Sequence, residues 1–406
     1  MSSTTSSAAS ATPSGLTGDL FAGDVPFPQL VIRWEDVLHN VRVVHGAVRA
    51  RGAYIAPHGK TSMSPEIFAV QLAGDTWGLT VATARQALVA RTAGATRILI
   101  ANQVVDEGGL RQLVSLARDP SLELLVLVDS VASVERLATA VRGSISRPIQ
   151  VLVELGIPGG RTGARGHAEL ESVVGSVESA APELELRGFE GFEGIIGGSD
   201  PADTLAQVDA FLDELREAAL ALRSRVRSDD AILSAGGSVF PDRVLERLGG
   251  DRAPGYRLVL RSGGYVTHDS RFYEERSPFA AGSPRFVGGE PLRPALELWA
   301  VVLACPEPGR AILGFGHRDA PSRLALPMPT LVRRADGSLD AIAGRAEIES
   351  MFDHHAYLRA DPDLPLAVGE HVCCGVSHPC EAFERWRTLL TIDERRQVTG
   401  RIHTEF

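Results

Sequence analysis

Short apolar runs rich in valine, isoleucine and leucine alternate with helix-period segments from about residue 54 to about residue 260. Continuous apolar strands that alternate with helices predict a parallel sheet buried on both faces. Eight such units favour a closed (β/α)8 barrel of the TIM type over an open doubly wound sheet. The predicted strands lie near Tyr54–Ala56, Gly78–Val81, Arg97–Ala101, Glu123–Val128, Ile149–Leu155, Leu184–Phe189, Ala231–Ser234 and Arg257–Leu260.

The chain changes character after about residue 265, where helical periodicity fades and short apolar runs are separated by glycine, proline and aspartate. This pattern predicts a mostly antiparallel β domain over residues 266–406. We place the barrel, with its leading strand and helix, at residues 30–265, and expect the segment before residue 30 to pack on the β domain. Residues 1–18 are small and polar and predict a disordered tail.

Composition excludes several classes of function. The formal net charge is −10 without a lysine- or arginine-rich run, which argues against nucleic acid and anionic membranes as partners. No apolar run approaches the roughly 20 residues that span a bilayer. Three of the four cysteines crowd between positions 373 and 380, a poor layout for disulfides, so we expect a reducing, cytoplasmic setting.

Lys60, a lone lysine, stands where the first predicted strand gives way to a loop. At the mouth of an α/β barrel a lysine is well placed to form a Schiff base with a carbonyl. Gly59-Lys60-Thr61 also resembles the end of a phosphate-binding P-loop, but that motif needs glycine where Tyr54 stands. An ordinary lysine in a βα loop is the remaining alternative.

Two glycine-rich loops follow the last two predicted strands. Glycine lets backbone N–H groups approach an anion closely, and the loops after strands seven and eight form the usual phosphate site of such barrels. A phosphate cradle and a lysine at one barrel mouth indicate pyridoxal phosphate (PLP). A nicotinamide cofactor has no comparable support, since no Gly-x-Gly-x-x-Gly follows a strand. The loop residues are Gly236, Gly237 and Ser238, then Gly263, Gly264 and Tyr265.

Arg161 lies between glycines after the fifth predicted strand. It is a candidate contact to the phenolate or ring of the cofactor. A surface arginine in a flexible loop is an equally good interpretation of this residue.

His378 and Cys380 are two residues apart near the end of the chain. In an extended strand both side chains would point to the same side. An imidazole and a thiolate form half of a site for zinc or a similar divalent ion, and two protein ligands leave positions for water and substrate. Manganese or magnesium is the alternative metal. Upstream, His355 is a candidate acid or base near the bound metal.

These motifs, with Pro57-His58-Gly59-Lys60-Thr61, Thr80-Val81-Ala82-Thr83 and Ile98–Gln103, resemble the D-threonine aldolase and D-serine dehydratase group. The group consists of fold-type III PLP enzymes with an alanine-racemase-like barrel, and the resemblance covers roughly residues 30–390. It implies that Lys60 holds the cofactor covalently, with His58 and the six glycine-loop residues nearby and Arg161 beside the ring. It also implies a metal on His378 and Cys380 with His355 close to it.

The sequence departs from this group at Phe192, where the family usually has tyrosine before an acidic residue and glycine. That departure leaves the ring-nitrogen contact unassigned. His378-Pro379-Cys380 looks most like the amino-acid deaminase branch, which tilts the expected reaction towards elimination.

The resemblance implies a PLP- and metal-dependent dehydratase, a lyase that converts 3-hydroxy D-amino acids such as D-threonine or D-serine to a 2-oxo acid and ammonia. One alternative is a D-threonine aldolase, which would cleave the Cα–Cβ bond on the same apparatus, with His355 as a candidate base. A different class is a non-catalytic PLP-binding protein, against which the large C-terminal domain argues. By analogy with the fold we expect a homodimer.

Overall fold

The structure is a computed structural model that describes residues 15, 17–74 and 76–406. It divides into two compact units. Val44–Lys60 and Gln71–Gly263 form the barrel unit. The segment up to Val43 joins Thr61–Val70 and Gly264–Phe406 in the β unit.

The barrel unit contains the predicted parallel sheet. Its strand order is β3-β11-β10-β9-β7-β6-β5-β4, and a parallel bridge between His58 and Thr80 joins the two ends into a barrel. The predicted fold class is therefore confirmed, with each strand within two residues of its predicted bounds. The strands are β3 (Tyr54–Ile55), β4 (Leu79–Val81), β5 (Arg97–Ile100), β6 (Glu123–Val128), β7 (Ile149–Gly156), β9 (Leu184–Gly191), β10 (Ile232–Ala235) and β11 (Arg257–Leu260), with β8 (Ala164–Arg165) paired to β7.

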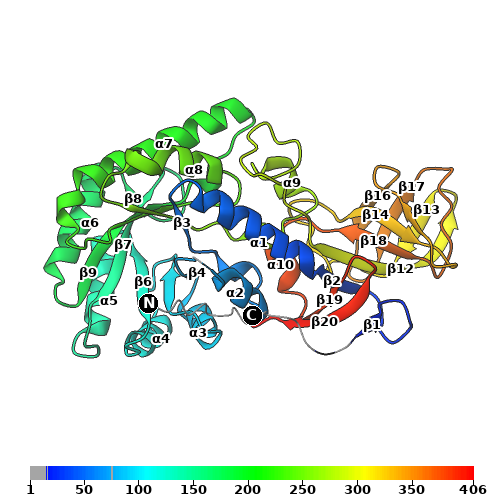
Figure 1. The fold of residues 1–406 in the computed structure, drawn as a ribbon, viewed down its shortest axis with the longest axis horizontal. Helices are drawn as coiled ribbons and strands as arrows, with labels where there is room; N and C mark the ends of the chain where they lie inside the picture. Colours follow the sequence, from blue (N-terminus) through cyan, green and yellow to red (C-terminus); the bar gives the residue numbers. More distant parts are fainter. Residues whose placement is uncertain (1–14, 16, 75) are drawn as a thin grey trace, which may run out of the picture. The chain divides into compact units, whose positions relative to one another are not determined.

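Helices follow the strands of the barrel unit in sequence and lie around its sheet (Figure 1). Several begin at a side-chain cap: Ser130 accepts from Ser133 N, and Asp106 accepts from Gly109 N. Such caps satisfy backbone donors that the first turn of a helix leaves unpaired. The helices are α3 (Ala84–Thr92), α4 (Glu107–Ala117), α5 (Val131–Val141), α6 (His167–Ser179), α7 (Pro201–Ala221) and α8 (Pro241–Leu248), with 3-10 turns η1 (Gly59–Thr61), η2 (Glu193–Ile195), η3 (Arg223–Arg225) and η4 (Gly250–Arg252).

The β unit is built on an eleven-stranded, mostly antiparallel sheet. Its main path runs β1-β20-β19-β2-β12-β13-β17-β16, while β18 pairs with β12 and β14. Its core includes Trp299, Val31 and Cys373, all buried. The strands are β1 (Gly18–Asp19), β2 (Gln29–Arg33), β12 (Leu296–Glu307), β13 (Arg310–Leu313), β14 (Met328–Arg333), β15 (Leu339–Ala341), β16 (Ala346–Met351), β17 (Ala356–Ala360), β18 (His371–Gly375), β19 (Thr388–Ile392) and β20 (Gln397–His403), with η5 (Gly264–Val266), α9 (Phe272–Arg276) and α10 (Pro379–Phe383).

The predicted barrel start at residue 30 differs from the structure. Strand β2 pairs with β12 and β19 and so belongs to the antiparallel sheet. Helices α1 (Trp34–Arg49) and α2 (Pro65–Leu72) each divide between the two units. An apolar strand followed by an amphipathic helix has the same pattern in either setting, so periodicity alone did not assign β2 to a sheet.

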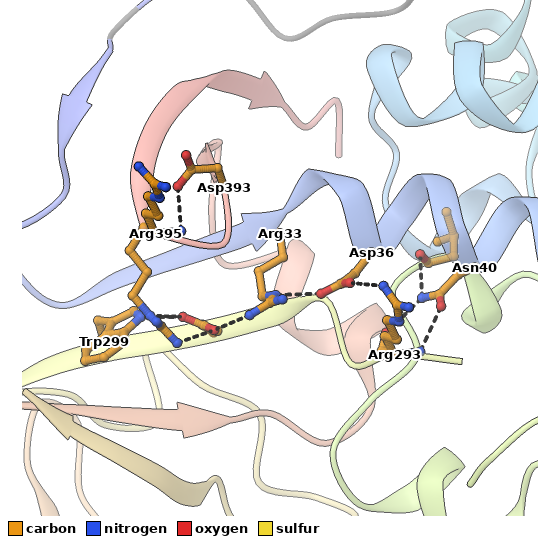
Figure 2. A network of polar contacts seen from close by, with 10 residues as sticks. Arg33, Asp36, Asn40, Arg293, Trp299, Asp393 and Arg395 are labelled. Carbon is orange, nitrogen blue, oxygen red and sulfur yellow. Dashed lines mark hydrogen bonds and ion pairs between the residues drawn. The ribbon is translucent and has the colours of Figure 1, made fainter. Parts of the chain in front are cut away.

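A polar network ties the start of α1 to the β unit (Figure 2). Arg33 Nε lies 2.5 Å from Asp36 Oδ2, and Arg293 Nη1 lies 3.4 Å from Asp36 Oδ1. Asn40 donates to the Arg293 carbonyl and accepts from its N–H, both at 2.8 Å. Because Asp36 and Asn40 are buried, these partners satisfy groups that would otherwise cost free energy to bury.

The predicted tail of residues 1–18 lies outside the described residues except for positions 15, 17 and 18. Gly18 pairs with Val398 of β20, and Leu20 and Val25 join the core of the β unit. The expected packing of the segment before residue 30 on the β domain is confirmed for these residues. Among the residues that the structure describes, no helix has the length and apolar character to cross a membrane.

Candidate functional site

Lys60 lies in the 3-10 turn η1, five residues after Ile55, which pairs with Leu260 as the last residue pair of β3 and β11. Two residues before it, His58 has a buried Nδ1 without a hydrogen-bond partner among the described residues. Burial and the neighbouring cations Lys60, Arg261 and Arg161 hold the pKa of His58 well below its ordinary value. The ring is therefore neutral at physiological pH, with a polar atom left to bind a ligand.

The loops after β10 and β11 lie together with the Lys60 segment. A Cβ on Gly263 would come within 2.4 Å of the His58 carbonyl oxygen, so only glycine fits at this close approach. Ser262 Oγ donates to the Gly237 carbonyl at 2.7 Å. Gly236 has a φ of +117° and a Cβ there would lie 2.4 Å from Leu260 Cδ1. The predicted glycine loops of the barrel unit therefore meet at the carboxyl ends of its strands.

Glu193, a residue to which we had assigned no role, fills part of this glycine cradle. Its carboxylate accepts from Gly236 N at 3.0 Å and from Gly237 N at 2.7 Å. The residue is fully buried, and desolvation raises the pKa of its carboxyl, opposed by these hydrogen bonds. Two of the backbone donors that we predicted for phosphate are thus paired with a side chain of the protein itself.

Arg161 lies over the ring of Phe192, with its guanidinium carbon 4.4 Å from the ring centroid. A cation above an aromatic face is electrostatically favourable. Phe192 therefore positions Arg161 even though it lacks the phenolic oxygen of the tyrosine that the family usually has.

A second unpredicted pair lies inside the barrel. Glu190 and Arg261, almost completely buried, form an ion pair, and Arg261 Nε donates to Ser234 Oγ at 3.0 Å. Burial raises the pKa of Glu190 to about 8, and Arg261 opposes the shift. Its Oε1 has no hydrogen-bond partner among the described residues. A glutamate near the end of one strand and an arginine directly after another were the available sequence signal.

The β unit brings His378 and Cys380 together. Interaction with the Cys380 side chain is the leading cause of a raised pKa of His378. The expected extended strand is wrong: β18 ends at Gly375, His378 adopts a left-handed conformation with φ 60° and ψ 81°, and Cys380 lies in the first turn of α10. The two side chains meet because a sharp turn precedes a helix, which spacing alone did not indicate.

Two further side chains hold this corner. Asp269 Oδ2 accepts from His378 N at 2.9 Å, and Thr61 Oγ1 lies 3.3 Å from Cys380 Sγ. Within the residues described, no group of three or more histidine, cysteine or acidic side chains is arranged to hold a metal ion. The donor set is thus one imidazole and one thiol, which suits a divalent ion with open positions rather than a closed structural site.

The other predicted residues lie as follows. His355 is exposed in the turn between β16 and β17, and its proximity to a metal stays a prediction. Gly264 and Tyr265 are buried in η5 of the β unit. Ser238 follows the Gly236–Gly237 pair in the barrel unit.

Comparison with known proteins gives the family. The model described as the alanine racemase N-terminal domain matches residues 32–238. The chain belongs to this family. It is a fold-type III PLP family, so the barrel unit is an alanine-racemase-like barrel. A serine dehydratase domain model matches residues 295–392 of this family member.

Individual relatives match this chain at low sequence identity or over only part of its length. The chain is 32% identical over 136 residues to the D-threo-3-hydroxyaspartate dehydratase of Delftia sp. (strain HT23), a match spanning 34% of this chain and 35% of that protein. The structure of D-threonine aldolase from Filomicrobium marinum has a TM-score of 0.79 and 23% identity over 97% of this chain and 98% of the other. That of the Delftia dehydratase has a TM-score of 0.73 and 21% identity over 94% and 98%. At these identities the structures establish the shared fold.

The residues present fit pyridoxal phosphate. The barrel unit offers the chain's only lysine, glycine loops that lie with the Lys60 segment and, among the described residues, buried polar atoms without hydrogen-bond partners on His58 and Glu190. Together these supply a covalent anchor and polar groups to meet the cofactor.

Proposed function

We propose that the protein is a PLP- and divalent-metal-dependent dehydratase that converts 3-hydroxy D-amino acids to 2-oxo acids and ammonia. One observation carries the proposal. Thr61, the residue after Lys60 in the chain, has its hydroxyl 3.3 Å from the thiol of Cys380. The candidate metal ligand is therefore hydrogen-bonded to the neighbour of the candidate cofactor lysine.

Elimination of water requires removal of the α-proton and departure of the β-hydroxyl group. Pyridoxal phosphate, when bound, supplies an electron sink for the carbon from which the proton leaves. Lys60 would hold it and, once released by the substrate amine, would accept the α-proton at Nζ. The neutral ring of His58 and the carboxyl of Glu190 would contact the cofactor, because each has a buried atom without a hydrogen-bond partner in the part of the chain that the structure describes.

His378 and Cys380 would hold the metal. A divalent ion supplies a Lewis acid that makes the β-hydroxyl a better leaving group. Nitrogen and sulfur donors together favour zinc over magnesium. One structure of a D-threo-3-hydroxyaspartate dehydratase is of a cysteine-to-alanine mutant in the metal-free form, which supports the proposed ligand role of Cys380.

The substrate class rests on the curated relative, whose name specifies elimination from D-threo-3-hydroxyaspartate. We extend to this chain the reaction type and the 3-hydroxy D-amino acid class. We also propose a homodimer in the cytoplasm, which sedimentation and localisation of a tagged chain would test.

Product analysis tests the reaction. Purified protein with PLP and zinc would be given D-threonine, or D-threo-3-hydroxyaspartate in parallel. Dehydration gives 2-oxobutyrate or oxaloacetate, each with ammonia. Retro-aldol cleavage gives glycine with acetaldehyde or glyoxylate, and its dominance would replace the dehydratase by an aldolase. Bound PLP without either product set would indicate a non-catalytic carrier.

A further inference from the structure

Glu381 adjoins the proposed metal pair, and no role follows for it from the reaction alone. We propose that Glu381 is a positioning residue that orients the His378 imidazole so that Nε2 binds the metal. The inference rests on the proposed metal site. It adds a side chain from outside the predicted ligand set.

The contacts form a short chain. Glu381 Oε1 lies 3.1 Å from His378 Nδ1, and Arg323 Nε lies 2.6 Å from the same carboxylate oxygen. The His378 and Glu381 side chains are 17% and 18% exposed, so the contact between them is partly shielded from water. Arg323 is 68% exposed and fixes the carboxylate from the solvent side.

This contact determines which imidazole nitrogen is free to bind the metal. With Nδ1 engaged by a carboxylate, the proton of the neutral ring resides on Nδ1 and Nε2 carries the lone pair. A metal-bound histidine commonly donates its other ring N–H to a carboxylate, which fixes the tautomer and ring orientation and raises ligand basicity. Glu381 is placed for that task.

The backbone of His378 is held separately. Asp269 accepts from His378 N at 2.9 Å through Oδ2, and its Oδ1 accepts from Arg271 N and Tyr273 N at 3.0 and 2.8 Å. The left-handed turn at His378 is thus held by backbone contacts, from Asp269 and from the Glu381 N–H, which donates to the His378 carbonyl at 3.2 Å, while the Glu381 carboxylate contacts the ring. Loss of the Glu381 carboxylate should therefore free the ring rotamer and leave the turn in place.

Glu381 does not complete a three-residue ligand set. Across the described residues, no cluster of three histidine, cysteine or acidic side chains is arranged for a metal. We therefore place the Glu381 carboxylate outside the ligand set of the metal, where it contacts His378. Its Oε1 is also engaged in the ion pair with Arg323.

The experiment measures metal affinity and coordination of PLP-loaded protein, without substrate. Wild type, Glu381→Ala, Glu381→Gln and the control Glu384→Gln would compete for zinc with a chromophoric chelator. Glu384 lies in the same segment, is 52% exposed and pairs with Arg385. Cobalt would replace zinc, because its visible ligand-field bands report the geometry around the metal.

We expect zinc binding about 10- to 100-fold weaker in Glu381→Ala, with altered cobalt bands. Glu381→Gln should fall between, because its amide oxygen still accepts from Nδ1–H, and Glu384→Gln should match wild type. Equal thermal unfolding and PLP absorbance across the set show that the fold is intact. Should the alanine variant fail to fold, the glutamine variant and Glu381→Asp carry the same comparison.

The outcomes separate the two proposals. Wild-type zinc affinity and cobalt bands in Glu381→Ala would overturn the positioning role and leave the metal site standing. If the Cys380→Ser and His378→Ala variants bound zinc as tightly as the wild type, the metal site would be overturned, and the positioning role with it.

Discussion

The candidate groups of the barrel unit and those around His378 are held by different kinds of structure. We call the first set the barrel end (His58, Lys60, Glu190, Glu193 and Arg261) and the second the metal corner (Thr61, Asp269, His378, Cys380 and Glu381). At the barrel end, side chains sit on or just after parallel strands, and buried carboxylates pair with a cation or with backbone N–H groups. At the metal corner, a left-handed residue and a five-residue helix place the donors.

The difference has an energetic consequence. Partners of a buried charge are strongly coupled to folding, since an unpaired buried charge costs several kcal/mol. Partners of a partly exposed group such as Glu381 contribute less to folding and more to orientation. Substitutions at the barrel end should therefore change stability and cofactor binding together. Substitution of Glu381 at the metal corner should change metal binding with little change in stability.

Replacing Lys60 by alanine carries the largest expected effect. Lys60 is the chain's only lysine, so the variant has no side-chain amine to hold an aldehyde. We expect the visible absorbance of bound PLP to disappear and turnover to fall by about 10²- to 10⁴-fold. Borohydride reduction followed by intact-mass and peptide analysis should place the cofactor mass on Lys60 in wild type. The same mass on the variant outside its N-terminal amine would contradict this role.

Replacing Arg261 by methionine tests the buried pair. Glu190 would lose the cation that lowers its carboxyl pKa, which burial has raised to about 8. A carboxyl whose pKa is higher in the folded than in the unfolded chain contributes stability below its unfolded pKa, and that contribution is lost as pH rises through the folded value. We expect the free energy of unfolding to fall by about 3–5 kcal/mol well above pH 8, where the Glu190 carboxyl of the wild type is ionised. The loss should be smaller at lower pH, where that carboxyl is protonated in both proteins.

The control is a double variant with Glu190→Gln, which has no charge to leave unpaired. Urea unfolding between about pH 7 and pH 10 should show a penalty that grows with pH in Arg261→Met and stays nearly flat in the double variant. A penalty of equal size at both ends would mean that the pair acts through packing.

Replacing Glu193 by alanine sharpens the comparison within the cradle. The N–H groups of Gly236 and Gly237 would lose their acceptor, and we expect the free energy of unfolding to fall by about 1–3 kcal/mol. If Glu193 holds the glycine loop in place, the alanine variant should also bind PLP more weakly than the wild type. Glu193→Gln should then have an intermediate PLP affinity. Equilibrium dialysis of PLP measures this. Tighter PLP binding in the alanine variant would instead mean that the carboxylate competes with the phosphate for these donors.

The sequence predicted the positions of Lys60 and the glycine loops better than the backbone geometry at His378, for a physical reason. Strand periodicity fixes where parallel strands end, so the positions of Lys60 and the Gly236 and Gly263 loops followed from the pattern. The His378 turn did not, because a left-handed residue before a short helix has no periodic signal. The prediction placed His378 and Cys380 side by side on an extended strand. In the structure they lie in a left-handed turn and the helix that follows it.

Strand periodicity also gave no indication of the side-chain pairings inside the barrel unit. Glu193 and the Gly236 amide are 43 residues apart, and Glu190 and Arg261 are 71 apart. No local rule links residues at such distances, although a charge within an apolar strand is a usable warning of a partner. The start of the barrel was misplaced for the same reason: β2 finds its partners near the end of the chain, in β12 and β19.

The smallest expected effect is at Thr61, where replacement by valine removes the hydroxyl that contacts Cys380 and keeps the shape. Thr61 is buried, as the carboxylates of the barrel end are. Its partner is a thiol, so its loss leaves no buried charge unpaired. One hydrogen bond is worth about 1 kcal/mol, so we expect zinc binding roughly fivefold weaker and PLP absorbance unchanged. Thr61→Ser, which keeps a hydroxyl, should restore the affinity in the same chelator competition. An equal loss in the valine and serine variants would show that the methyl group matters, and that the metal corner depends on packing as the barrel end does.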